Sequence, residues 1–345
     1  MFRPLLVVLY LVVVAVLFVR IYEKLPVNRD VKISKTRDVF HIYTDASILA
    51  RGENPYQRIQ GKDMKTNEKY TFYLPGFLWA AAAGIKYFGI DSYQEFMQTW
   101  IPISVGVHFL IGLVLFLYAM SRWGIIPGIL ASSFWWFTRW PLALLRSGQI
   151  DNVAILFFVI ALVVLERQRL LGLVMLGVSL CIKQMAAFTV PLFLVWPALN
   201  GKVTVKRALD FGIQIGALCA VPLILSLPFI YWDIESFINM LLFPLTRDPV
   251  GPMSLESFLD PGNQERSFLF KLPFLSLLAL SYLYLVRQKE FLFPSILFIL
   301  LLFLGFNSVF FSRYFCWAIP LIPLACFECL ERVREDRRDD RGYSC

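Results

Sequence analysis

Long runs of apolar residues, separated by short polar tracts, cover most of the 345-residue chain. The first run, residues 4–19, is followed by Arg20, Tyr22 and Lys24, which can anchor a helix at a membrane interface. Because no small residues are placed for signal-peptide cleavage, we expect this run to be a retained transmembrane helix. Further apolar runs lie near residues 72–90, 100–120, 124–145, 152–165, 170–199, 208–231, 269–286, 291–310 and 314–330. The pattern predicts an all-α, polytopic transmembrane helical bundle of about 9–11 spans, since one span needs about 20 mostly apolar residues.

Two of the apolar runs contain a residue that should interrupt a helix. Lys183 lies inside the run 170–199, and Trp140-Pro141 lies inside the run 124–145. Proline removes a helical hydrogen bond, and a lysine at membrane depth is costly unless it is paired or reaches the interface. We therefore expect both runs to be broken at these positions.

Two longer polar stretches lie within what we expect to be a single transmembrane domain, residues 1–331. Residues 23–70 follow the first helix, residues 232–268 are rich in Pro and Gly, and residues 332–345 form a charged tail. Short loops rich in Lys and Arg mark the cytoplasmic side, which makes the tail cytoplasmic and both polar loops non-cytoplasmic. Counting spans forwards from a cytoplasmic N-terminus places the first loop outside, whereas counting backwards from Arg167 places it on the cytoplasmic side. One segment between residues 72 and 150 is therefore split, re-entrant or miscounted.

The composition agrees with a membrane location. Hydrophobic residues make up 58% of the chain and charged residues 17%, against about 25% charged in soluble domains. The net charge of +8 comes without a basic block or an aromatic RNA-binding motif, so nucleic acid is not an expected partner. The expected location is a multi-pass protein of the cell membrane, or of the endoplasmic reticulum in a eukaryote.

The cysteines give no sign of a metal site. Four of them lie in apolar runs, and Cys326-x-x-Cys329 has neither a second pair nor a histidine to complete a zinc site. Small buried hydrophobic residues are the better interpretation, and we expect neither a metal nor a cofactor.

The segment after the first helix carries the most informative pattern. Its apolar residues recur at helical spacing: Val39, Ile42, Ala46 and Leu49. Asp38 and Asp45, with His41 or Ile42 between them, fall along one face, and Gly52 and Asn54-Pro55 provide a helix stop and a turn. A short amphipathic helix after a transmembrane span should lie on the bilayer surface, where it would hold one or two carboxylates. The alternative is a solvated loop whose acids balance nearby Lys and Arg.

Polar residues also lie at the ends of later apolar runs. The segment from Arg146 to Asn152 contains Arg146, Gln149, Asp151 and Asn152. Polar groups at membrane depth usually belong to a site or a pathway, although an ordinary interhelical loop would look the same. The topology places Lys183 and Arg313 on the same side as this segment. Cations beside a membrane-surface carboxylate suggest a phosphate-bearing lipid as the ligand. Tyr73 begins the next run, where an interfacial aromatic belt is a sufficient explanation.

The order of these motifs resembles the GT-C superfamily of polytopic glycosyltransferases, which use polyprenyl-phosphate sugars. The series comprises Asp38, an aromatic pair, Ala46, Gly52-x-Asn-Pro-Tyr56, Tyr73-x-Pro75, Gly148-Gln-x-Asp-Asn152 and Lys183. It is most similar to the PimE-like mannosyltransferases that depend on polyprenol-phosphate mannose. The resemblance covers roughly residues 1–200, with a weaker match at Ser312-Arg-Tyr-Phe. The chain departs from the family in Leu74-Pro75-Gly76, where Tyr-Pro-Pro is commoner, and in having fewer C-terminal spans than many relatives.

The resemblance implies a site. An acidic residue in the first non-cytoplasmic loop serves as the base, which corresponds to Asp38. Asp45, similar to the acid of a Thr-Asp-Ala stretch in related mannosyltransferases, is the second choice. The expected phosphate-binding residues are Lys183, Arg313 and Arg146. The residues expected to contact sugar or shape the cavity are His41, Tyr73, Gln149, Asp151, Asn152 and Tyr314.

The implied activity is inverting transfer of a hexose, foremost mannose, from a polyprenyl- or dolichyl-phosphate donor to a lipid, glycan or protein hydroxyl. Two other classes remain open. A transporter or flippase would use the same buried polar residues to bind its substrate, although no internal repeat is visible in the hydropathy. A non-catalytic membrane scaffold needs no carboxylate on a surface helix.

Overall fold

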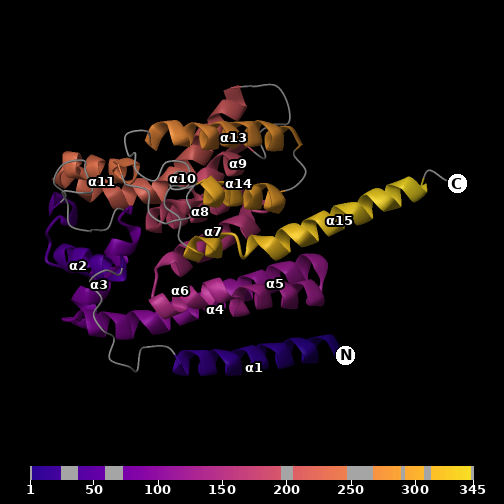
Figure 1. Cartoon of the computed structure of the whole chain (residues 1–345), viewed down its shortest axis with the longest axis horizontal. Helices are drawn as coiled ribbons and strands as arrows, with labels where there is room; N and C mark the ends of the chain where they lie inside the picture. Colours follow the sequence, from indigo (N-terminus) through magenta and orange to yellow (C-terminus); the bar gives the residue numbers. More distant parts are fainter. Residues whose placement is uncertain are drawn as a thin grey trace. The chain divides into compact units, whose positions relative to one another are not determined.

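The fold is helical throughout the part of the chain that the computed structural model describes (Figure 1). The described ranges are residues 2–24, 38–58, 73–195, 205–246, 267–288, 292–306 and 312–342. They contain no strand, which confirms the all-α prediction. The chain forms two compact units, each built from three separate stretches. Unit 1 comprises Met1–Ile111, Pro141–Ala186 and Ile213–Asp248, and unit 2 comprises Gly112–Trp140, Ala187–Gly212 and Pro249–Cys345.

Three of the described helices are long and apolar enough to cross a membrane. They lie in α1 (Phe2–Glu23), α4 (Tyr93–Trp123) and α10 (Val205–Trp232). The shorter apolar helices have at most 17 residues, about 25 Å at 1.5 Å per residue, whereas the hydrocarbon core is about 30 Å thick. The larger number of spans therefore stays a prediction.

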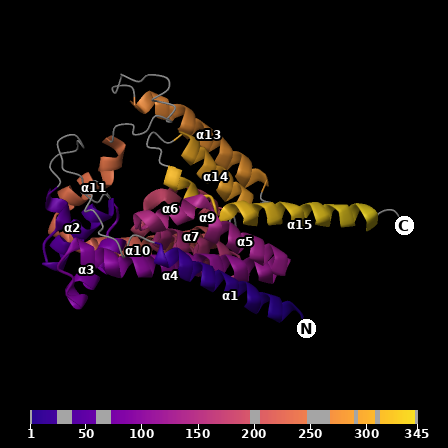
Figure 2. The same cartoon turned by 60° about the horizontal axis from the view of Figure 1, so that its bottom comes forward.

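Within unit 1, the C-terminal part of helix α1 contacts the middle of α4 (Figure 2). The Phe18 ring lies 5.6 Å from the His108 ring and 5.5 Å from the Phe109 ring, measured between centroids. The rest of α1 leaves large apolar side chains exposed, among them Leu5, Leu9, Val12, Val16 and Val19. Such a continuous apolar surface is typical of a helix that faces lipid.

The amphipathic helix predicted after α1 is present as α2 (Asp38–Ala50), and it packs against α3 (Gly76–Phe88). All four apolar positions of its predicted face are buried. It ends as predicted before Gly52, whose φ of 83° lies in the left-handed region that favours glycine. Its location on a bilayer surface stays a prediction.

The predicted break near Trp140-Pro141 is confirmed, two residues earlier than expected. α5 (Ile125–Phe137) ends at Thr138, whose extended backbone separates it from α6 (Arg139–Ser147). Pro141 then lies in the first turn of α6, where the missing N–H would have no partner in any case.

The predicted break at Lys183 is also confirmed. α8 (Arg169–Ile182) stops there because Lys183 adopts an extended backbone, with φ −156° and ψ 128°. The chain continues as the 3-10 helix η4 (Gln184–Thr189) and the short helix α9 (Val190–Val195).

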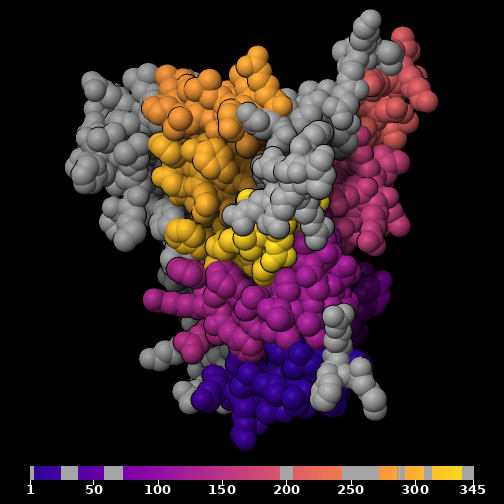
Figure 3. Space-filling model, turned by 90° about the vertical axis from the view of Figure 1, so that its right-hand side faces the viewer, coloured from indigo at the N-terminus to yellow at the C-terminus, as the bar shows by residue number. Residues whose placement is uncertain are grey.

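Within unit 2, α13 (Ser267–Gln288), α14 (Leu292–Phe306) and α15 (Leu321–Gly342) lie side by side (Figure 3). The Glu328 carboxylate accepts hydrogen bonds from the backbone N–H groups of Leu292 and Phe293, at 3.2 and 2.9 Å. These N–H groups have no partner inside α14, and an acid also suits the positive end of the helix dipole.

Most of the predicted charged tail, residues 332–345, continues α15 as a helix to Gly342. The predicted polar loop 232–268 contains the helix α11 (Ile234–Thr246) and the start of α13 at Ser267. Residues 247–266 of that loop lie outside the described residues.

Candidate functional site

A buried ion pair forms the centre of the site in unit 1. The Lys183 ammonium donates to both Asp151 carboxylate oxygens, at 2.8 and 2.7 Å. Lys183 is 3% exposed and Asp151 is fully buried. Buried charges are tolerated only when they are paired, because a single ion in an apolar interior loses its hydration. The residue expected to bind a phosphate is therefore already paired with a carboxylate expected to shape the cavity.

The turn between α6 and α7 (Asp151–Leu165) positions the acid of this pair. Gly148 has φ 66°, and the N–H groups of Gly148 and Gln149 donate to the last carbonyls of α6, as in a helix C-cap. The Trp100 indole donates to the Gly148 carbonyl at 2.6 Å and holds the turn against α4. Asp151 then lies in the first turn of α7, where the helix dipole favours a negative charge.

A close approach of α3 to α8 brings an aromatic ring to the lysine. A Cβ added to Gly76 would lie only 2.9 Å from the Cys181 sulfur and 3.0 Å from its carbonyl oxygen, so a side chain here would force α3 or α8 to shift. Tyr73 lies three residues before Gly76, outside α3, and the Lys183 ammonium lies 5.4 Å from the centroid of its ring. A cation at this distance from an aromatic face is attracted by the ring electrons.

Tyr56 connects this centre to α2. Its hydroxyl donates to the Tyr73 carbonyl at 2.9 Å, and its ring lies 5.0 Å from that of Phe229. The Asn54 side chain accepts a hydrogen bond from the Tyr56 N–H at 3.0 Å and shapes the turn at Pro55. Burial, followed by the nearby Asp45 charge, raises the pKa of Tyr56 well above its usual value, so the hydroxyl remains a donor.

The two candidate bases on α2 differ in accessibility. Asp45 is 2% exposed and faces the interior near Tyr56. Asp38 is half-buried in the first turn of the helix, and His41 is half-buried one turn later. The structure therefore joins Asp45 to the buried centre and leaves Asp38 closer to the surface of unit 1.

Two further predicted residues are buried beside the pair. Gln149 is 3% exposed in the α6–α7 turn. Asn152 is fully buried, and its amide donates to the Ser104 hydroxyl of α4 at 3.2 Å, while its side-chain oxygen has no partner among the described residues. Gln149 and Asn152 lie on either side of Asp151 in the sequence, and these three residues and Lys183 form a buried cluster of polar side chains.

The other predicted residues lie elsewhere. Arg146 is exposed in the last turn of α6 and is not part of the buried cluster. Arg313 and Tyr314 belong to the 3-10 helix η6 (Ser312–Trp317) of unit 2. There Tyr314 is buried and Arg313 is half-buried, with its guanidinium carbon 6.0 Å from the centroid of the Tyr314 ring.

No cluster of three or more His, Cys, Asp or Glu side chains that could hold a metal occurs in the described ranges. Comparisons with family models, curated proteins and solved structures give no match to the chain.

The sequence reasoning missed Tyr56, Trp100 and Ser104 as members of the site. Tyr56 had a signal in the sequence, because it is the last residue of the Gly52-x-Asn-Pro-Tyr56 motif that follows the carboxylate-bearing helix. Trp100 and Ser104 had none, since each is one of many such residues in an apolar run and acquires its role only by packing against the α6–α7 turn.

Proposed function

We propose that the chain is a multi-pass membrane glycosyltransferase of the GT-C type. It transfers a hexose, foremost mannose, from a polyprenyl- or dolichyl-phosphate donor to a hydroxyl acceptor at the non-cytoplasmic membrane face. The observation that carries the proposal is the buried Lys183–Asp151 pair, which Tyr73 and Tyr56 connect to the acid-bearing helix α2. Ionisable groups among apolar helices are costly and usually functional.

In this proposal Asp38 is the general base. A base must reach the acceptor hydroxyl, and Asp38 is more accessible than Asp45. The carboxylate takes the hydroxyl proton as the acceptor oxygen bonds to the anomeric carbon. The bond from that carbon to the phosphate oxygen breaks on the opposite face, which inverts the configuration and releases polyprenyl phosphate. Because a phosphate leaves without protonation, one carboxylate suffices, unlike the pair of an inverting glycosidase.

In this proposal, cationic side chains bind the donor phosphate. Lys183, oriented by Asp151 and Tyr73, is the buried candidate. Arg313 and Arg146 are the other two, and their guanidinium groups suit bidentate phosphate binding. Gln149, Asn152, His41 and Tyr314 would contact the sugar or shape the cavity.

A transfer assay tests this function. Membranes that carry the protein, and so supply the acceptor, are incubated with polyprenyl-phosphate mannose labelled in the sugar. We expect one molecule of polyprenyl phosphate to be released for each labelled sugar that is transferred to the acceptor. Arg313→Ala should raise the apparent Michaelis constant for the donor roughly 10- to 150-fold, because a charge-assisted contact contributes about 1.5–3 kcal/mol.

Arg332→Ala is the matched control, since Arg332 is exposed and forms a long 4.0 Å ion pair on α15. Its donor dependence should equal that of the wild type. If no polyprenyl-phosphate sugar is used, while sealed vesicles that carry the protein accumulate a labelled substrate, the transporter function replaces the proposal.

The topology can be tested separately. The ring of Phe237 in α11 lies 6.1 Å from that of Tyr56, so the two polar loops meet within unit 1 and should share one side of the membrane. In a cysteine-free variant, Glu53→Cys and Glu235→Cys, both at exposed positions, should react with an impermeant maleimide on intact cells. Glu335→Cys in α15 should react only after permeabilisation. Labelling of only one of the two loop positions would contradict a shared side.

A further inference from the structure

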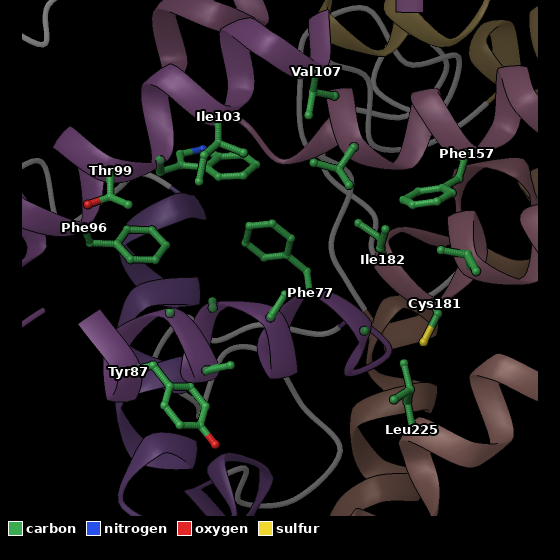
Figure 4. Close-up of a pocket in the computed structure, with 18 of the residues that line it drawn as sticks. Phe77, Tyr87, Phe96, Thr99, Ile103, Val107, Phe157, Cys181, Ile182 and Leu225 are labelled. Atoms are coloured by element: carbon green, nitrogen blue, oxygen red, sulfur yellow. The ribbon is translucent and has the colours of Figure 1, made fainter. Parts of the chain in front are cut away.

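An apolar cavity of about 590 Å³ lies within unit 1. Its walls come from α3, α4, α7, α8 and α10, and Figure 4 shows the Phe77 ring projecting into the space between Phe96, Phe157 and Ile182. Polar groups are scarce on the walls. The Trp100 indole N–H, which could serve a ligand, already donates to the Gly148 carbonyl. The cavity therefore suits an apolar ligand.

The sequence of α3 leaves this space open. The wall residues on α3 include Ala80, Ala81, Ala83 and Gly84, where apolar helices elsewhere in the chain carry Leu, Ile or Phe. A Cβ added to Gly84 would meet no atom within 4 Å. Because alanine and glycine side chains are small, this run of residues leaves an open apolar cavity beside α3.

The cavity extends along the whole of α3. Ile182 and Val153 line it, next to Lys183 and two residues after Asp151. Its α3 wall runs from Gly76 to Phe88, about 18 Å at 1.5 Å per residue. At the far end Tyr87 and Phe88 are 80% and 77% exposed. The cavity is thus apolar along its length. It is open at the end formed by Tyr87 and Phe88 and also along one side, where Ala80, Ala83 and Ile103 are exposed.

Water is a poor occupant of such a space, because it needs two to four polar partners. Leaving the cavity empty would forfeit the dispersion contacts of its walls. Around a membrane protein, the abundant apolar material is lipid chain. We propose that the cavity binds one hydrocarbon chain of a membrane lipid. The proposal rests on the membrane location proposed above and not on the transfer reaction.

Photolabelling in nanodiscs tests the proposal without any sugar donor. The full-length protein is reconstituted with phosphatidylcholine that carries a diazirine in its acyl chain, irradiated and digested. We expect adducts on peptides that contain residues 77–88 and 178–182. Gly84→Leu should reduce them at least tenfold, because the leucine fills open space and also favours the helix.

Gly106→Leu is the matched control. Gly106 is also helical and meets no atom within 4 Å of an added Cβ, but it does not line the cavity. Its labelling should equal that of the wild type. If Gly84→Leu lowers the melting temperature, Ala83→Leu at a neighbouring wall position replaces it.

Equal labelling of the wild type and the cavity-filling variant would overturn the proposal. So would adducts confined to exposed helices such as α1, or labelling of the cavity by a water-soluble diazirine probe and not by the lipid. Because the readout is the position of the adduct, loss of the glycosyltransferase function would leave this result unchanged.

Discussion

Asp38→Asn is expected to abolish sugar transfer while the protein level and donor binding persist. The amide keeps the size of the carboxylate but cannot take a proton, and loss of a general base typically costs about 10²–10⁴-fold in rate. Asp38 lies half-buried in the first turn of α2, where an acceptor can reach it. The measurement is transfer of labelled sugar from a polyprenyl-phosphate donor in membranes with matched protein levels.

Asp45→Asn is the matched control on the same helix. Asp45 lies seven residues later, about 10 Å along the axis, so the two acids cannot act on the same hydroxyl. It is 2% exposed and near Tyr56, so its amide variant should lose activity only through disturbed packing. An inactive Asp45→Asn with an active Asp38→Asn would reassign the base. If both variants transfer sugar at the wild-type rate, the catalytic carboxylate lies elsewhere, with Asp151 the next candidate.

Removing one partner of the Lys183–Asp151 pair is expected to destabilise the fold by about 3–5 kcal/mol, because the remaining charge stays buried without its partner. Lys183→Ala and Asp151→Ala should each show this loss in unfolding of the purified protein. The double variant Lys183→Met/Asp151→Leu should recover most of it, since a well-packed apolar pair can replace a buried ion pair. Arg332→Ala, which breaks an exposed pair, should change stability by about 0–1 kcal/mol.

The double variant also separates structure from function. If it is stable but transfers no sugar, the pair serves the site, in agreement with phosphate binding by Lys183. If it is stable and active, the pair serves the fold alone. Unchanged stability of both single variants would contradict the burial argument.

Local signals sufficed for several elements. The periodicity of Val39, Ile42, Ala46 and Leu49 predicted α2 and its buried face, and Gly52 marked its end. Lys183 and Pro141 predicted approximately where two apolar runs would break. A lysine at membrane depth is costly, and a proline removes a helical hydrogen bond, so both signals are local. The composition alone predicted membrane helices, three of which have the required length among the described residues.

The partners of the polar residues depended on tertiary structure. Lys183 and Asp151 lie 16 residues on either side of Arg167, in the turn between α7 and α8, so an antiparallel pair of helices brings them to the same end. Only the packing decides that their side chains meet. Their contact follows from the packing of α7 against α8, where the Ser179 hydroxyl also donates to the Ala154 carbonyl at 2.8 Å. The sequence pattern assigned Arg146 to the same candidate site as Gln149, Asp151 and Asn152. In the structure Arg146 is exposed before the turn that ends α6, whereas these three residues, which follow Gly148, are buried. Periodicity determines which residues share a face of one helix, but the packing of several helices decides which faces meet.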